Sequence, residues 1–203
     1  MKRFSLVVLL GLAIALVMPG SAANIVYSNG PINGTINAWG FSDIYGLANS
    51  FVSTGPVTVT GFDAGIWVFS GDTPTTVTWE ILTGGPDWMG GTVLASGNGT
   101  WSNVFWGQNS FYYADIYTST ISRLNVSIGA GTYWLELLNG HTAVYGWAYW
   151  DENDGPSQFY GLNEVPDGSN AFTIYGTPEP GTILMFGSGI IGLAGVLRRK
   201  INL

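Results

Sequence analysis

Apolar and polar residues alternate along several short stretches of this chain. Val77, Trp79 and Ile81 share one face of such a stretch, and Thr78 and Glu80 lie on the other. A period of two residues is typical of half-buried antiparallel strands. No stretch of the interior follows the period of 3.6 residues that predicts a helix. The same alternation recurs at 57–60, 123–128, 132–137 and 172–174. The pattern predicts an all-β fold.

Segments rich in glycine, asparagine and proline separate these stretches. Such a composition is typical of turns, and we predict turns at 84–87, 90–91, 97–99, 129–131 and 139–140. Many short strands with frequent turns are typical of an antiparallel β-sandwich, and we expect a jelly-roll-like arrangement.

The first 23 residues have the features of a secretory signal peptide. Lys2 and Arg3 precede an apolar core, and small residues follow that core up to Ala23. This order predicts delivery to the secretion translocon and cleavage after Ala23. The alternative is an uncleaved N-terminal anchor. Residues 24–176 remain as one exported domain of ordinary size.

Residues 177–203 form a segment with three parts. In order, these are Pro178, Glu179 and Pro180, an apolar run at 181–197, and the basic residues Arg198, Arg199 and Lys200. As a helix the run would be about 26 Å long, close to the roughly 30 Å of a hydrocarbon core. We therefore predict a transmembrane helix at 181–197. The basic cluster is expected to stay in the cytoplasm, with the domain on the far side of the inner membrane.

This tail resembles the PEP-CTERM sorting signal of Gram-negative bacteria. In that family Pro-Glu-Pro precedes a glycine-rich hydrophobic helix and a final arginine cluster. The resemblance implies recognition by an exosortase, a membrane transpeptidase that cuts near the motif. It also implies a host that makes extracellular polysaccharide or biofilm. We expect transient anchoring in the inner membrane, followed by transfer to the cell surface or extracellular matrix. The alternative is an ordinary C-terminal membrane anchor.

Charge separates the domain from the two terminal segments. Residues 24–176 contain twelve acidic residues and a single basic one, Arg123, which gives a net charge of −11. Such a surface repels phosphate backbones and excludes nucleic-acid binding. The chain also has no cysteine, so disulfides and Cys-ligated metals are excluded.

Few residues are candidates for catalysis. His141 is the only histidine and follows Asn139-Gly140, so we interpret it as an exposed turn residue rather than part of a catalytic triad. Glu80 and Glu136 form a carboxylate pair of the kind that glycan hydrolases use. No known catalytic spacing accompanies them. We predict no catalytic residue and a protein that is not an enzyme, with a glycan hydrolase as the alternative.

The run Asp151-Glu152-Asn153-Asp154-Gly155 is the densest group of side-chain oxygens. Calcium binds carboxylate and carbonyl oxygens on flexible loops, but the spacing of an EF-hand is absent. The main interpretation is a solvated acidic loop. The alternative is a calcium site at Asp151 and Asp154, and we predict no other cofactor.

Aromatic residues suggest a binding surface. Tyr145, Trp147 and Tyr149 alternate, so they would share one face of a strand. Exposed rings stack on the apolar faces of sugars, whereas the alternative is that the rings fill the core. We predict a non-enzymatic exported protein with a structural or adhesive role in exopolysaccharide or biofilm. The alternative is a carbohydrate-binding module that uses these three rings, with exopolysaccharide as its partner.

Overall fold

The computed structural model describes residues 24–35, 37–162 and 168–179. Within this part of the chain the regular structure is strand, apart from one short 3-10 helix. In chain order the elements are β1 (Asn24–Ser28), β2 (Ala38–Gly40), β3 (Gly46–Ser53), β4 (Val57–Phe69), β5 (Pro74–Thr83), η1 (Asp87–Met89), β6 (Thr92–Thr100), β7 (Ser102–Asn109), β8 (Ala114–Ile128), β9 (Gly131–Thr142), β10 (Tyr149–Asn153), β11 (Phe159–Leu162), β12 (Ser169–Asn170) and β13 (Phe172–Pro178).

The two predicted terminal segments lie outside the described residues. They are the signal peptide at 1–23, including Ala23, and the tail from Pro180 onward, including the helix predicted at 181–197 and the basic residues 198–200. Among the residues that are described, no helix is both long enough and apolar enough to cross a membrane.

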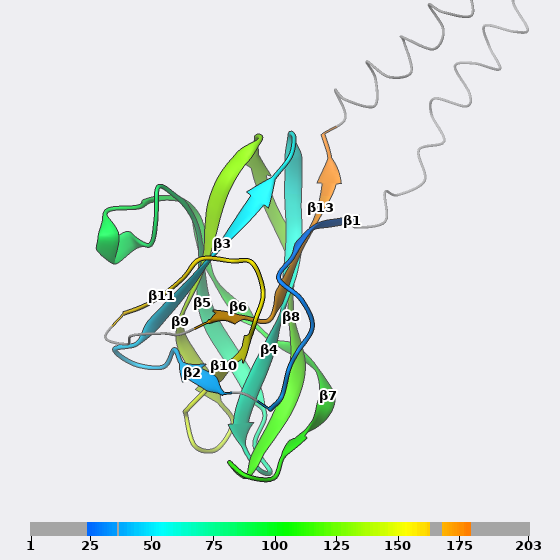
Figure 1. Ribbon diagram of the computed structural model, residues 1–203, viewed down its shortest axis with the longest axis vertical. Helices are drawn as coiled ribbons and strands as arrows, with labels where there is room; N and C mark the ends of the chain where they lie inside the picture. Colours follow the sequence, from blue (N-terminus) through cyan, green and yellow to red (C-terminus); the bar gives the residue numbers. More distant parts are fainter. Residues whose placement is uncertain (1–23, 36, 163–167, 180–203) are drawn as a thin grey trace, which may run out of the picture.

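The strands form two antiparallel sheets, as Figure 1 shows. In the first sheet the order is β1-β13-β4-β8-β7. In addition, β10 pairs with the last part of β4, and both β2 and β12 pair with β10. In the second sheet the order is β11-β3-β9-β5-β6. The all-β prediction is confirmed for the described residues.

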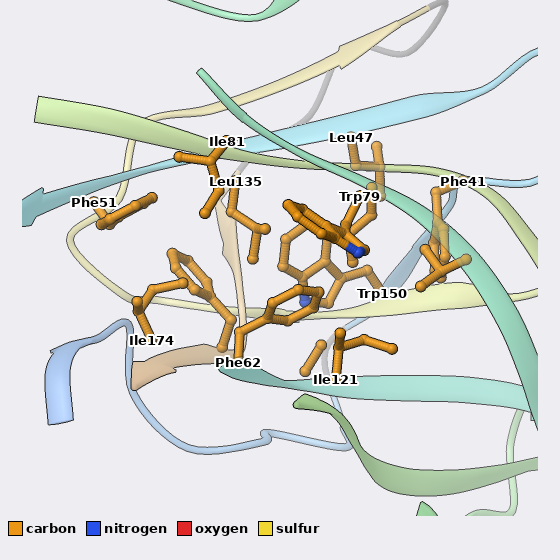
Figure 2. Packing of buried hydrophobic residues seen from close by; sticks show 14 of the residues in the cluster. Phe41, Leu47, Phe51, Phe62, Trp79, Ile81, Ile121, Leu135, Trp150 and Ile174 are labelled. Atoms are coloured by element: carbon orange, nitrogen blue, oxygen red, sulfur yellow. The ribbon is translucent and has the colours of Figure 1, made fainter. Parts of the chain in front are cut away.

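One apolar core lies between the sheets. Phe62 and Ile174 come from the first sheet, and Leu135 and Ile81 come from the second; all four are fully buried. Figure 2 shows them pointing into the same interior, together with Trp150 of β10. Each such side chain contributes about 1.5–3 kcal/mol on burial. The core thus holds the two sheets face to face.

The alternation read from the sequence places the inward faces correctly. Val77, Trp79 and Ile81 are buried in β5. Val126 and Ile128 are buried in β8, and Ser127 between them is exposed. All five predicted strand segments lie within longer strands.

Two of the predicted turns are wrong. Residues 97–99 lie inside β6 and residues 139–140 lie inside β9. A Cβ on Gly97 would come within 2.9 Å of the Trp79 ring, and a Cβ on Gly140 would overlap the ring of Phe41. These glycines allow close approach of a ring to a strand rather than a reversal of the chain.

The outer face of the second sheet is covered near its centre. Trp134 and Glu136 point to this face, yet both are buried. The loop between β5 and β6, residues 84–91, folds over them, and Trp88 packs against Ala48, Leu82 and Trp134. In Figure 1 this loop is the green segment that carries η1. A polar face was predicted here, but the loop makes it a second small core.

Candidate functional site

Three loops meet at one end of the sheets, at the bottom of Figure 1. They are the β4–β5 turn, the β7–β8 turn and the β9–β10 loop. The rings of Phe69 and Tyr145 pack edge to face with centroids 5.5 Å apart. We call this region the aromatic end; its rings are Phe69, Phe111, Tyr112, Tyr113, Tyr145, Trp147 and Tyr149.

Asp72, in the β4–β5 turn, holds the β9–β10 loop in place. Its carboxylate accepts hydrogen bonds from the backbone N–H groups of Val144 and Tyr145 and from the hydroxyl of Thr142, at 2.6–3.0 Å. Burial alone would raise the pKa of Asp72, but the bonds from Thr142 and from the backbone outweigh it and lower that pKa. The loop that carries Tyr145 is therefore fixed by a buried charge.

The β7–β8 turn is held in a similar way. The side-chain oxygen of Asn109 accepts hydrogen bonds from the backbone N–H groups of Phe111 and Tyr112, each at 3.0 Å. Ser70 of the β4–β5 turn donates its backbone N–H to the carbonyl of Tyr113 at 3.0 Å. Phe111 is 79 % exposed and Tyr113 is 78 % exposed. Fixed backbone thus presents two rings to solvent.

A cavity of about 250 Å³ opens beside these rings. Trp67, Phe69, Tyr112 and Tyr149 line it, and Asn37 adds a polar side chain. Aromatic rings can stack on the apolar face of a sugar, and an amide can form hydrogen bonds with its hydroxyl groups. The chemistry of this cavity fits a carbohydrate better than a charged ligand.

The sequence analysis found part of this site. Tyr149 begins β10 and lines the cavity, whereas Tyr145 and Trp147 lie in the β9–β10 loop. The three residues do not share one strand face, because β10 begins only at Tyr149. Trp67 and Tyr112 were missed. The run of three aromatic residues at 111–113 between two strands is the signal that would have found the β7–β8 turn.

The predicted sorting motif begins at the opposite end of the first sheet. Pro178 is the last residue of β13 and pairs with Val57, the first residue of β4. Phe69 is the last residue of β4. A strand of 13 residues spans about 40 Å. Glu179 follows β13 directly, and Pro180 lies outside the described residues.

The predicted calcium residues lie in different surroundings. Asp151 is fully buried in β10 and accepts hydrogen bonds from the backbone N–H groups of Asn33 and Gly34 and from the indole of Trp67, at 2.6–2.9 Å. Burial raises the pKa of Asp151 although these three donors oppose it. Asp154 is exposed. The structure therefore gives Asp151 a set of N–H partners.

The carboxylate pair Glu80 and Glu136 is brought together. The two residues lie directly opposite each other on β5 and β9, on the outer face of the second sheet. Asp87 of η1 completes a group in which one carboxylate oxygen from each residue lies within 4.8 Å of the other two. We call these three residues the acidic cluster. Sequence reasoning missed Asp87, because it reaches the pair only through the fold of the β5–β6 loop.

The acidic cluster is electrostatically strained. Glu136 is 0 % exposed. Burial, together with the carboxylates of Asp87 and Glu80, raises the pKa of Glu136 to about 8. The hydrogen bond from the Asp87 backbone N–H acts in the opposite direction and lowers this pKa. Burial and Asp87 also raise the pKa of Glu80. These groups hold protons or cations more readily than isolated carboxylates do.

Comparison with known families identifies the tail. The family profile of the PEP-CTERM protein-sorting motif matches residues 177–200, which confirms the resemblance and is consistent with an exosortase substrate. The match begins inside β13, at Thr177. A search of curated proteins returned no match to the chain.

Proposed function

We propose that this is an exported protein that an exosortase processes and that then has a structural or adhesive role in exopolysaccharide or biofilm. The observation that carries the proposal is the arrangement of its two ends. The sorting motif continues β13 at one end of β4, and the aromatic end lies at the other. A domain held by its tail would therefore present the aromatic rings away from the membrane.

We also infer that the sandwich is a jelly roll. Supporting this, the four strands β1-β13-β4-β8 lie in one sheet and the four strands β3-β9-β5-β6 lie in the other. Successive strands change sheet except from β1 to β2, from β12 to β13, and at the β5–β6 and β7–β8 hairpins. Two four-stranded sheets with such crossings are typical of the jelly roll.

Processing of the tail is tested by mass spectrometry of the protein extracted from the cell surface. We expect the mature form to lack Arg198, Arg199 and Lys200. We also expect it to keep Thr177 and Pro178, because both pair with β4 and a cut before them would remove part of the sheet. Unprocessed protein from whole cells is the control. A surface form that retains the basic tail would make the segment an ordinary anchor.

A second candidate function is carbohydrate binding at the aromatic end. The cavity lined by Trp67, Phe69, Tyr112 and Tyr149 favours it. Tyr145 extends the apolar surface beside this cavity, since it packs on Phe69, and the partly exposed Trp147 lies in the same β9–β10 loop. With a net charge of −11 over residues 24–176, neutral glycans are better ligands than acidic ones.

Replacing Trp147 or Tyr145 with alanine is expected to weaken polysaccharide binding about tenfold, since loss of one stacked ring costs roughly 1–1.5 kcal/mol. Pull-down on host polysaccharide measures the binding, and thermal melts measure folding. Tyr160→Ala is the matched control, because Tyr160 and Trp147 are both 39 % exposed but Tyr160 lies on β11 of the other sheet. Equal binding by all variants would exclude stacking here, as would a loss of binding explained by unfolding.

We propose that the protein acts without catalysis. Glu136, the buried member of the carboxylate pair, supports this because its carboxylate is closed off from solvent and a glycan would not reach it. The test is release of reducing sugar from host polysaccharide. Release that Glu80→Gln or Glu136→Gln abolishes would instead make the protein a glycan hydrolase.

A further inference from the structure

The acidic cluster joins three separate segments of the chain. Glu80 comes from β5, Glu136 from β9 and Asp87 from η1 in the β5–β6 loop. One carboxylate oxygen from each residue lies within 4.8 Å of the other two, and Trp88 beside Asp87 packs on the same sheet face. The apolar contact of Trp88 and the hydrogen bond from the Asp87 backbone N–H to Glu136 thus hold the loop over the two strands.

Two oxygens of the cluster have no hydrogen-bond partner. They are Oε1 of Glu136, which is fully buried, and Oε2 of Glu80. The other oxygen of Glu136, Oε2, accepts a hydrogen bond from the Asp87 backbone N–H at 3.2 Å. Leaving a buried charged acceptor unpaired destabilises the folded state. The two free oxygens point to a partner that the protein chain does not supply.

Among the residues that the structure describes, no basic side chain balances these carboxylates. Arg123 is the only lysine or arginine between residues 24 and 176, and it lies in β8 of the other sheet. His141 is exposed at the far end of β9, and Ala48 of β3 stands opposite Glu136. Charge balance must therefore come from solution, as a proton or as a cation.

We propose that Glu80, Asp87 and Glu136 bind a hard divalent cation of the calcium type, which fastens the β5–β6 loop to the second sheet. All the donors are carboxylate oxygens, the ligands that calcium prefers. Calcium accepts one or two oxygens from each carboxylate and completes its shell with water. Asp87 is exposed, so it provides the side from which the ion and its water molecules reach the buried oxygens.

The test is a thermal melt of the full-length protein, first stripped with a chelator and then titrated with calcium chloride. A ligand that binds only the folded state raises the melting temperature. We expect a rise of about 5–10 °C when calcium is about 100 times its dissociation constant. An unchanged melting temperature at millimolar calcium would overturn the proposal and leave a shared proton as the partner.

Three variants locate the ion. Asp87→Asn removes an exposed ligand, so we expect it to fold and to lose most of the calcium-induced rise. Glu136→Gln keeps the side-chain shape and should abolish the rise. Asp154→Asn is the control, because it removes an exposed carboxylate elsewhere, and it should keep the full rise. Retention of the rise in Asp87→Asn and Glu136→Gln would overturn the assignment, as would its loss in Asp154→Asn.

Discussion

Replacing Asp151 with alanine is expected to lower the free energy of unfolding by about 3–5 kcal/mol. Three N–H donors, on Asn33, Gly34 and Trp67, would lose their acceptor. Each unsatisfied buried donor costs about 1–3 kcal/mol. Relief from burying the carboxylate offsets part of this, because burial raises the pKa of Asp151 and so opposes its charged form. Urea denaturation with an unchanged slope measures the loss.

Two variants check this explanation. Asp151→Asn retains one side-chain oxygen and should lose less stability than Asp151→Ala. Asp154→Ala, three residues along and exposed, should stay within about 0.5 kcal/mol of the wild type. The loss in Asp151→Ala should be equal with calcium and with chelator. A loss that appears only with calcium would instead make Asp151 a metal ligand, as the acidic run first suggested.

The sequence was most informative where strands bury one face. In β5 the apolar residues Val77, Trp79 and Ile81 alternate with polar ones, and the sheet buries the apolar face. This alternation is a local property that a period of two reveals. The pairing of β5 with β9 is not local, and nothing in the alternation indicates that Glu80 and Glu136 stand opposite each other.

Turns predicted from glycine and asparagine were wrong where packing determined the backbone conformation. Asn139 has a φ of 49°, as an Asn-Gly turn would require, but β9 continues through it. Gly140 instead leaves room for the ring of Phe41. Likewise the acidic run at 151–155 looked solvated, yet Asp151 is buried because the segment that contains Asn33 and Gly34 covers it. Local composition does not report such long-range contacts.

The candidate sites were predictable in part. The sorting motif of the tail could be identified without knowledge of the fold, because it is continuous in sequence. The aromatic end was only partly found, since Tyr149 follows from local pattern while Trp67 comes from the end of β4. The acidic cluster required the β5–β6 loop to fold back onto its own sheet. Such a return depends on the packing of Trp88 against Trp134 and Ala48.

Glu136→Gln is expected to change how stability depends on pH when metal is removed by a chelator. In the folded protein the pKa of Glu136 rises from 4.5 to about 8, so the folded state keeps a proton that the unfolded state releases. Stability from this group is complete below pH 4.5 and is lost as pH rises through about 8. The loss amounts to about 3–5 kcal/mol.

The glutamine side chain carries no charge at any pH, so this loss should disappear in the variant. We expect Glu136→Gln to be more stable than the wild type at pH 8 and to lose that advantage near pH 5. The other groups facing Glu136, which are Glu80 from β5 and Asp87 from the loop, remain in both proteins. The difference between the two urea-denaturation profiles therefore isolates Glu136, and Asp154→Asn should follow the wild type. Parallel profiles for Glu136→Gln and the wild type from pH 5 to 8 would show that Glu136 does not carry the proton.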